Sequence, residues 1–322
     1  MSARPQPCFI VLNAAAGHQD SQDTAAIIRE VLEQAGRPHR LLLAERGSDI
    51  PALARQAVAL AKAEDGIVVA AGGDGTINAV AQAALGCGQP FAVLPQGTFN
   101  YFGRAHGIAQ DTREATTALL TAVARPVQVG LVNDRVFLVN ASLGLYPQLL
   151  EDREAFKKRY GRSRLVAMLS GLLSFLRERR QLNIEVEIDG AGGVEPRVHR
   201  LRTPTLFVGN NGLQLQQIGI AEADAVDRGK LVAIALKPVS TLAMIGLLLR
   251  GAFGRLGEAD QVLSLPLRQL TVRPPGFSRR RRYKVAMDGE VTRMPAPLVF
   301  RVSPKPLLLM VPQAAVPEQS TP

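Results

Sequence analysis

The sequence predicts an α/β protein, in which an N-terminal domain with a doubly wound parallel sheet precedes a β-rich, β-sandwich-like second domain. In the first third, short and wholly apolar runs alternate with longer stretches of helical spacing. After about residue 126 the texture changes to Val-rich runs with period-two alternation. With 322 residues, 47% of them hydrophobic and only 5% aromatic, the chain can form two aliphatic cores.

The first domain is built from repeated β-α-β units. Strands without polar alternation are expected in a sheet that is covered on both faces. Between them lie segments with the spacing of amphipathic helices, which implies parallel strands joined by helical crossovers. The predicted strands are 8–13, 39–45, 66–71 and 91–95, and the predicted helices are 25–36, 48–64 and 76–86.

The second domain is predicted from alternating segments such as NIEVEID (183–189) and PTLFVGNN (204–211). These are typical of antiparallel strands. Helices are expected at about 147–160, 163–180 and 239–250. We therefore divide the chain into residues 1–128, residues 129–312 and a disordered tail at 313–322.

The net charge and the cysteine content of the chain indicate which binding partners and which cellular compartment to expect. A net charge of +10 and a pI near 10.2 favour polyanionic partners, which include phosphorylated ligands, anionic lipid surfaces and nucleic acid. Cys8 and Cys87 support neither a disulfide framework nor a thiolate metal site. No secretory signal or bilayer-spanning segment is expected, and the predicted location is the cytoplasm.

A glycine-rich junction follows the third predicted strand, where GIVVAA runs into GGDGT and then into a helix. Successive backbone N–H groups at such a turn, together with the positive end of a helix, bind phosphate. A simple tight turn is the alternative. Asp74 argues against it, because a carboxylate beside phosphate implies that a metal ion or a reacting hydroxyl lies between them.

A second loop, PQGTFNYFGR (95–104), follows the next strand, and Asn13 and Gly17 follow the first. The carboxyl ends of parallel strands meet at one edge of a sheet, where open α/β proteins bind ligands. We therefore expect these loops to line one crevice.

The segments VLNAAAG, GGDGTIN, PQGTFNYFGR and MDGE (287–290) occur in the order and context of the diacylglycerol kinase catalytic-domain family, which the chain resembles. This family includes sphingosine and ceramide kinases, soluble enzymes that transfer the γ-phosphate of ATP to a lipid hydroxyl with Mg²⁺. The resemblance implies an ATP site at a cleft between the two domains. The implied ATP-binding residues are Asn13, Gly17, Gly72, Gly73, Gly75, Thr76, Asn78, Gly97, Thr98 and Asn100.

The resemblance also implies three catalytic carboxylates. Glu290, or Asp288 two residues earlier, matches the acid that takes the proton from the acceptor hydroxyl, and Asp74 would orient the metal or the acceptor. Taken alone, the segment 288–290 also fits a hairpin turn, which Asp-Gly favours.

Three positions depart from the family pattern. Ala16 removes a hydroxyl from the first loop, and Tyr101 stands where an aspartate commonly follows the loop asparagine. Arg228 stands where some bacterial members have an acid that binds a structural Mg²⁺. Because a guanidinium cannot ligate a cation, we expect Arg228 to pair with Asp224 or Asp227 and no metal at that loop.

The chain is thus expected to be an ATP-dependent lipid kinase that acts at the inner face of the membrane. Basic segments at 156–164 and 277–284 are compatible with contact with anionic lipid. Solvated basic ends on a packed helix are the more economical explanation of the first, and a solvated loop or contacts with the phosphates of ATP also explain the arginines at 279–282. Nucleic acid is not expected, because aromatic platforms are sparse. An unpaired sheet edge would permit a homodimer. The alternatives are an NAD kinase-like small-molecule kinase and a non-catalytic nucleotide- or lipid-binding protein.

Overall fold

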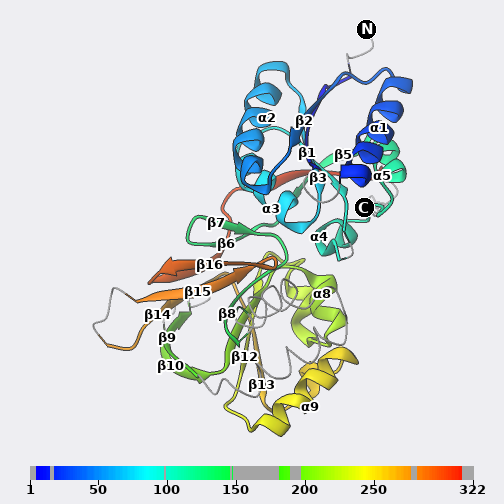
Figure 1. Ribbon diagram of the computed structural model, residues 1–322. Helices are drawn as coiled ribbons and strands as arrows, with labels where there is room; N and C mark the ends of the chain where they lie inside the picture. Colours follow the sequence, from blue (N-terminus) through cyan, green and yellow to red (C-terminus); the bar gives the residue numbers. More distant parts are fainter. Residues whose placement is uncertain are drawn as a thin grey trace, which may run out of the picture. The chain divides into compact units, whose positions relative to one another are not determined.

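The computed structural model describes residues 5–14, 18–97, 99–145, 147, 181–188, 197–276 and 281–313. The chain divides into two compact units. Unit 1 comprises Met1–Val129 together with Pro304–Pro322, and unit 2 comprises Gly130–Ser303. Each unit has its own sheet structure, so each is described by itself (Figure 1).

Unit 1 contains a mixed sheet of six strands in the order β2-β1-β3-β4-β18-β5. The first four strands and β18 are parallel, and β5 runs antiparallel to β18. Every residue of β3 is buried, as predicted for a strand covered on both faces. The strands are β1 (Cys8–Asn13), β2 (His39–Ala44), β3 (Ile67–Gly72), β4 (Phe91–Pro95), β5 (Val123–Val127) and β18 (Leu307–Val311).

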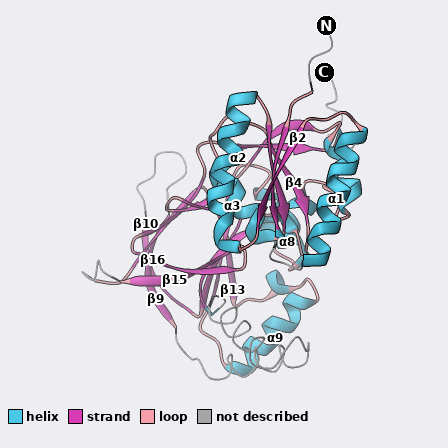
Figure 2. Cartoon of the chain, turned by 45° about the horizontal axis from the view of Figure 1, so that its top comes forward, coloured by secondary structure: helices cyan, strands magenta, loops and turns pink. Residues whose placement is uncertain are grey.

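Helices cover both faces of this sheet (Figure 2), so the predicted doubly wound α/β class is confirmed. α2 packs with α3 on one face, and α1 packs with α5 on the other. The helices are α1 (His18–Gln34), α2 (Ile50–Glu64), α3 (Asp74–Ala84), α4 (Tyr101–Ala105) and α5 (Thr112–Leu119), with a short 3₁₀ helix, η2 (Gly47–Asp49).

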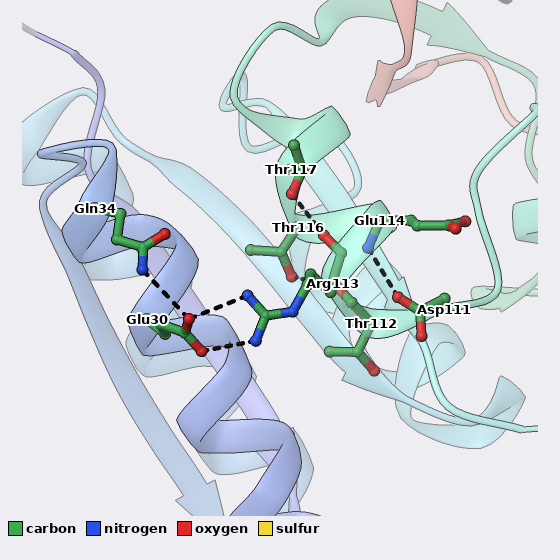
Figure 3. Close-up of polar contacts among 8 residues, drawn as sticks. All are labelled: Glu30, Gln34, Asp111, Thr112, Arg113, Glu114, Thr116 and Thr117. Carbon is green, nitrogen blue, oxygen red and sulfur yellow. Dashed lines mark hydrogen bonds and ion pairs between the residues drawn. The ribbon is translucent and has the colours of Figure 1, made fainter.

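An ion pair joins α1 to α5 (Figure 3). The Arg113 guanidinium donates from Nη2 to Glu30 Oε2 at 2.7 Å and from Nη1 to Oε1 at 3.3 Å. Gln34 donates to the same carboxylate from one helical turn away. The Asp111 side chain caps α5 by accepting from the Glu114 amide at 3.0 Å. These contacts fix two helices that are far apart in the sequence on the same face.

The last described strand differs from its predicted position. The sequence boundary at residue 312 assigns residues 307–311 to the second domain, but β18 lies between β4 and β5 in the sheet of unit 1. Leu307 and Leu309 are completely or almost completely buried there. An apolar strand can pair with any sheet edge that provides hydrogen-bond partners and an apolar core. The residues of the strand alone do not show which sheet it joins.

Unit 2 consists of two six-stranded sheets in which all paired strands are antiparallel, as predicted for the β-rich part. Their inner faces share one core, with Leu143 and Val285 from one sheet and Ile184 and Phe300 from the other. The first sheet has the order β10-β9-β14-β17-β6-β7 and the second β13-β12-β11-β8-β15-β16.

The bounds of the elements of unit 2 follow in chain order. The strands are β6 (Gly130–Val132), β7 (Arg135–Phe137), β8 (Asn140–Gly144), β9 (Leu182–Ile188), β10 (Arg197–Thr203), β11 (Thr205–Gly209), β12 (Leu231–Leu236), β13 (Val262–Leu267), β14 (Gln269–Arg273), β15 (Arg282–Met287), β16 (Glu290–Pro295) and β17 (Leu298–Val302). The helices are α8 (Gly212–Gln217) and α9 (Thr241–Ala252), with 3₁₀ helices η3 (Ala221–Ala225) and η4 (Leu256–Glu258).

Of the three helices predicted in the second domain, the one at 239–250 is observed as α9. The predicted helices at 147–160 and 163–180, the basic segment at 156–164 and the tail beyond 313 lie outside the described residues, apart from Pro147 and Gln313. Among the helices of the described part of the chain, none is both long and apolar enough to span a bilayer.

Candidate functional site

The carboxyl ends of β1, β3 and β4 lie at one edge of the unit 1 sheet, as parallel strands require. Asn13, the last residue of β1, donates from its side-chain amide to Thr76 Oγ1 at 3.3 Å. Thr76 lies in the first turn of α3 and is buried. The end of β1 and the first turn of α3 are thus linked through two of the residues that the sequence assigns to the nucleotide site.

The glycine-rich segment becomes helical earlier than predicted. The sequence places the start of the helix at Thr76, whereas α3 begins at Asp74 with Gly73 as its N-cap residue. The Gly73 carbonyl accepts the Ile77 amide at 3.0 Å. Asp74 therefore lies in the first helical turn, where a negative charge is stabilised by the positive end of the helix. This position accounts for an aspartate beside the glycines even without a ligand.

The space available for a side chain differs between Gly72 and Gly73. A Cβ on Gly72 would lie 2.7 Å from both Cβ and Oγ1 of Thr76, closer than packed atoms approach. A Cβ on Gly73 would meet only the Gln96 carbonyl oxygen, at 3.5 Å. Packing therefore requires Gly72, whereas at Gly73 the missing side chain leaves the start of α3 without a side-chain cap.

The loop after β4 is held against the loop after β3. The Gln96 amide donates to the Gly72 carbonyl at 2.9 Å. Asn100 is fully buried, with a left-handed backbone (φ 39°), and its side-chain amide donates to the Gly97 carbonyl at 2.6 Å and to Gln110 Oε1 at 2.9 Å. Sequence analysis missed Gln110, because no local motif links it to a loop ten residues earlier.

Most of the predicted nucleotide-binding residues thus lie at one sheet edge in unit 1. Gly75 and Asn78 follow in α3, which positions them on the same helix as Thr76. Gly17, Thr98 and the departure at Ala16 lie outside the described residues. The residues that the structure brings together are Asn13, Gly72, Gly73, Thr76, Gly97 and Asn100.

Tyr101 is part of an aromatic and cationic cluster. Its ring stacks on Phe99 with a centroid separation of 6.3 Å and an interplanar angle of 12°. The Arg104 guanidinium carbon lies 5.5 Å from the centroid of the Tyr101 ring. Where the family pattern has a carboxylate, this loop therefore has an aromatic ring in contact with a cation.

In unit 2, Asp288 forms a network with the backbone that begins β8. Its carboxylate accepts three backbone N–H groups, from Leu138 at 2.7 Å, Val139 at 2.9 Å and Asn140 at 3.0 Å. The Asp288 amide donates to the Asn140 carbonyl at 3.0 Å. Three donors stabilise the charged carboxylate and occupy its lone pairs.

The same segment forms the two-residue hairpin turn between β15 and β16. Met287 pairs with Glu290, and both turn residues have positive φ, 47° for Asp288 and 91° for Gly289. The hairpin interpretation of this segment is therefore correct. It is compatible with a chemical role for Glu290, the first residue of β16, whose side chain is exposed and forms no hydrogen bond or ion pair with any residue that the structure describes.

The pairing predicted for Arg228 is present at the end of η3. Arg228 donates to both carboxylate oxygens of Asp224, at 2.5 and 3.2 Å. This hydrogen bonding, together with the positive charge, holds the pKa of Asp224 below its usual range. Within the described ranges, no group of three or more histidine, cysteine, aspartate or glutamate residues is arranged to hold a metal ion.

The chain belongs to a class of protein that combines an α/β unit, whose strand-end loops meet at one sheet edge, with an antiparallel β unit. Residues 7–132 match the family described as "Diacylglycerol kinase catalytic domain". The resemblance that the motifs indicate is therefore confirmed over residues 7–132.

Individual relatives agree with this assignment. The chain is 32% identical over 190 residues to the diacylglycerol kinase of Bacillus subtilis (strain 168), covering 56% of this chain and 59% of the relative. It is 36% identical over 163 residues to the "Probable lipid kinase YegS-like" protein of Pseudomonas aeruginosa, covering 50% and 51% respectively. The chain thus spans between half and three fifths of these relatives.

The fold extends further than the sequence similarity. A crystal structure of a diacylglycerol kinase from Bacillus anthracis str. Sterne superposes with a TM-score of 0.68, covering 98% of this chain and 100% of that chain. The sequence identity is 17%, so this likeness concerns the fold alone. The structural likeness therefore includes the part of the chain after residue 132, which the family match does not cover.

Proposed function

We propose that this protein is an ATP-dependent lipid kinase that transfers the γ-phosphate of ATP to a lipid hydroxyl such as that of diacylglycerol. The observation that carries the proposal is the match of residues 7–132 to the diacylglycerol kinase catalytic domain, whose loops converge at one sheet edge. The names of the Bacillus subtilis and Pseudomonas relatives support the lipid class.

In this proposal, the edge of unit 1 holds the phosphates of ATP. Gly73 leaves the N–H groups of the first turn of α3 without a side-chain cap, which fits an anion at the positive end of the helix. Mg²⁺ entering with ATP would neutralise charge on the phosphates, and Asp74 would orient it or the acceptor. The proposed ATP-binding residues remain Asn13, Gly17, Gly72, Gly73, Gly75, Thr76, Asn78, Gly97, Thr98 and Asn100.

Of the two candidate bases, the contacts favour Glu290. Asp288 already binds three backbone N–H groups, which makes it a positioning residue for β8 and the hairpin. The Glu290 carboxylate is exposed at the end of that hairpin. In the proposed step it takes the proton of the acceptor hydroxyl as the oxygen bonds to the γ-phosphorus and ADP leaves.

The cellular setting is part of the same proposal. A soluble kinase with a lipid acceptor would work in the cytoplasm at the inner face of the membrane, where ATP is available and the net charge of +10 favours anionic lipid. At the η3 loop, the Arg228–Asp224 pair would take the place of a structural cation. In that case Mg²⁺ and EDTA leave the melting temperature of the ligand-free protein unchanged.

The experiment that tests the kinase activity uses labelled ATP, Mg²⁺ and mixed micelles that contain diacylglycerol, monoacylglycerol, ceramide or sphingoid bases. The expected result is label in one lipid, with Glu290→Gln and Asp74→Asn each reducing kcat by roughly a hundredfold or more. If no lipid takes label at saturating ATP, the proposal is overturned. In a parallel incubation with NAD in place of the lipids, transfer of label to NAD would establish an NAD kinase-like enzyme.

The surroundings of Tyr101 favour a second candidate, a nucleotide- or lipid-binding protein without turnover. The ring and its Arg104 neighbour replace the carboxylate that the family pattern places in this loop. This candidate predicts ATP binding without transfer to any lipid and an affinity for ATP that Glu290→Gln does not change. Isothermal titration with ATP, run beside the transfer assay, distinguishes it from the kinase.

A further inference from the structure

Helix α9 of unit 2, yellow in Figure 1, carries exposed apolar side chains. Leu249 is 56% exposed, and Phe253, one helical turn later, is 78% exposed. Residues four apart lie on the same side of a helix, so these two side chains form one face. Leu247, on the other side, is 4% exposed and packs with Leu236 and Ala259. The helix is thus anchored by one face and presents large apolar side chains on the other.

The charge around this face has one sign. The segment from Lys237 to Gly257, which contains α9, has Lys237, Arg250 and Arg255 and no aspartate or glutamate. Arg250 follows Leu249 directly, is exposed, and its side chain makes no hydrogen bond or ion pair with any described residue. The next acid, Glu258, accepts a hydrogen bond from Arg255 at 2.9 Å, and this bond, with a smaller contribution from the nearby charge of Arg250, lowers the pKa of Glu258. Arg250 therefore brings a cation to the edge of the apolar face.

We infer that α9 is a membrane-docking helix that inserts Phe253 and Leu249 into the surface of an anionic bilayer. An amphipathic helix with aromatic and leucine side chains beside basic residues binds at the boundary between headgroups and acyl chains. Each nearby basic residue strengthens attraction to anionic lipid. The inference rests on the proposed lipid kinase function for the source of the lipid, and it assigns the membrane contact to a helix that the sequence predicted but did not connect with a membrane.

The charge pattern favours a bilayer over a second copy of the chain. A second copy would bring another α9 with the same Arg250 and Arg255, and the next acid in the sequence, Glu258, is already bound by Arg255 of its own chain. An anionic surface complements the cations and accepts the apolar side chains in the same contact. The size of Phe253 and Leu249 suits shallow insertion.

The test measures binding of the full chain to vesicles by sedimentation, without ATP. The vesicles are phosphatidylcholine alone or phosphatidylcholine with about a third phosphatidylglycerol. Phe253→Glu is expected to lower binding to the anionic vesicles by about tenfold or more. Arg250→Ala is expected to lower it about fivefold. Val198→Glu, at a 58% exposed valine on β10, is the matched control and should bind as the parent does.

A spectroscopic arm locates the contact directly. The chain contains no tryptophan, so Phe253→Trp introduces a single tryptophan, which can be excited selectively at wavelengths where the four tyrosines do not absorb. Its emission should shift to shorter wavelength on anionic vesicles and be quenched by brominated acyl chains, whereas Val198→Trp should show neither effect. Thermal melts of all variants confirm that they fold, which their exposed positions favour.

Several outcomes would overturn the inference. The inference is wrong if Phe253→Glu binds vesicles as well as the parent does. It is also wrong if the parent binds neutral and anionic vesicles equally, or if the tryptophan emission of vesicle-bound Phe253→Trp is not shifted. A parent dimer that Phe253→Glu dissociates without lipid, with vesicle binding unchanged, would make the face an interface between copies.

The kinase proposal and the docking proposal can fail separately. Phosphorylation of a water-soluble, short-chain diacylglycerol should be the same for the parent and Phe253→Glu, because docking is needed only for a substrate in a bilayer. Vesicle binding through Phe253 without phosphorylation of any lipid would remove the kinase and leave the docking helix. Phosphorylation with vesicle binding that does not depend on Phe253 would remove the docking helix and leave the kinase.

Discussion

At the residue scale, Gly72 and Gly73 are adjacent in the sequence but have different surroundings. We predict that Gly72→Ala lowers the free energy of unfolding by roughly 1–3 kcal/mol, because the new methyl group would overlap Thr76. Gly73→Ser should keep the stability within about 0.5 kcal/mol or raise it, since serine is a good N-cap residue and there is space for it. Urea unfolding of the two variants measures both values.

Gly73→Ser also tests the nucleotide site. A serine hydroxyl that caps α3 would compete with phosphate for the same N–H groups, so ATP affinity should fall roughly tenfold, the equivalent of one hydrogen bond to a charged group. Equal unfolding energies for Gly72→Ala and the parent would show that the packing around Thr76 is looser than described. Unchanged ATP affinity in Gly73→Ser would show that phosphate binds elsewhere.

Asp288 and Glu290 are two residues apart, yet their contacts predict opposite phenotypes. Asp288→Ala leaves three backbone N–H groups without their acceptor and should lower the free energy of unfolding by about 3 kcal/mol or more. Glu290→Gln changes an exposed group and should alter stability by less than about 0.5 kcal/mol while it abolishes transfer. Thermal melts and the transfer assay on both variants separate the two roles. A melting temperature for Asp288→Ala equal to that of the parent would contradict the positioning role.

At the element scale, the Glu30–Arg113 pair should make the packing of α1 on α5 sensitive to acid. Hydrogen bonds from Arg113, and its charge, hold the pKa of Glu30 below its usual range. A depressed carboxylate pKa contributes stability at pH values above the unfolded value of about 4.3, and the contribution is lost as the pH falls through the lower folded value. The difference in melting temperature between the parent and Glu30→Gln should therefore be constant near neutral pH, begin to shrink as the pH falls past about 4.3, and disappear once the pH is below the lower folded pKa of Glu30.

Glu33→Gln is the matched control for this prediction, because Glu33 is an exposed glutamate on the same helix. Its melting temperature should follow that of the parent across the same pH range. The Glu30–Arg113 pair is half exposed, so added salt should reduce its effect. A difference between the parent and Glu30→Gln that grows as the pH falls would contradict the assignment.

Prediction from sequence succeeds for elements whose pattern is local. The continuous apolar runs that became β1, β2, β3 and β4 need only their own residues to be recognised. The start of α3 was misplaced by two residues, because glycines weaken a helical pattern even where the chain is already helical.

At the scale of the whole molecule, the chain leaves unit 1 for unit 2 after residue 129 and returns at residue 304. The returning segment supplies β18, which separates β4 from β5. We predict that truncation after Ser303 strongly destabilises unit 1, because it exposes the cores beside β4 and leaves β5 without its partner. Truncation after Gln313 retains β18 and should preserve the melting temperature. Circular dichroism of the two truncated chains against the full chain measures the difference, and equal melting curves would contradict the role of β18.

The parts of the candidate site that can be predicted from the sequence are those that depend on short local motifs. GGDGT and PQGTFN are short, and their position after apolar strands already predicts a shared sheet edge, which the Gln96–Gly72 hydrogen bond realises. The partners of Asn100 and Asp288 could not be found in this way. Their contacts join Asn100 to Gln110 and Asp288 to the start of β8, and no sequence motif encodes such a pairing.

The sequence by itself determined the α/β class of the first unit, the β-rich class of the second and the family motifs, because each depends on residues that are close together in the chain. The tertiary structure alone decided that β18 completes the first sheet, that Asp288 supports β8 while Glu290 stays exposed, and that α9 presents Phe253 outward. The physical reason is that hydrogen bonds and burial are satisfied by whichever group the fold brings near, at any distance along the chain.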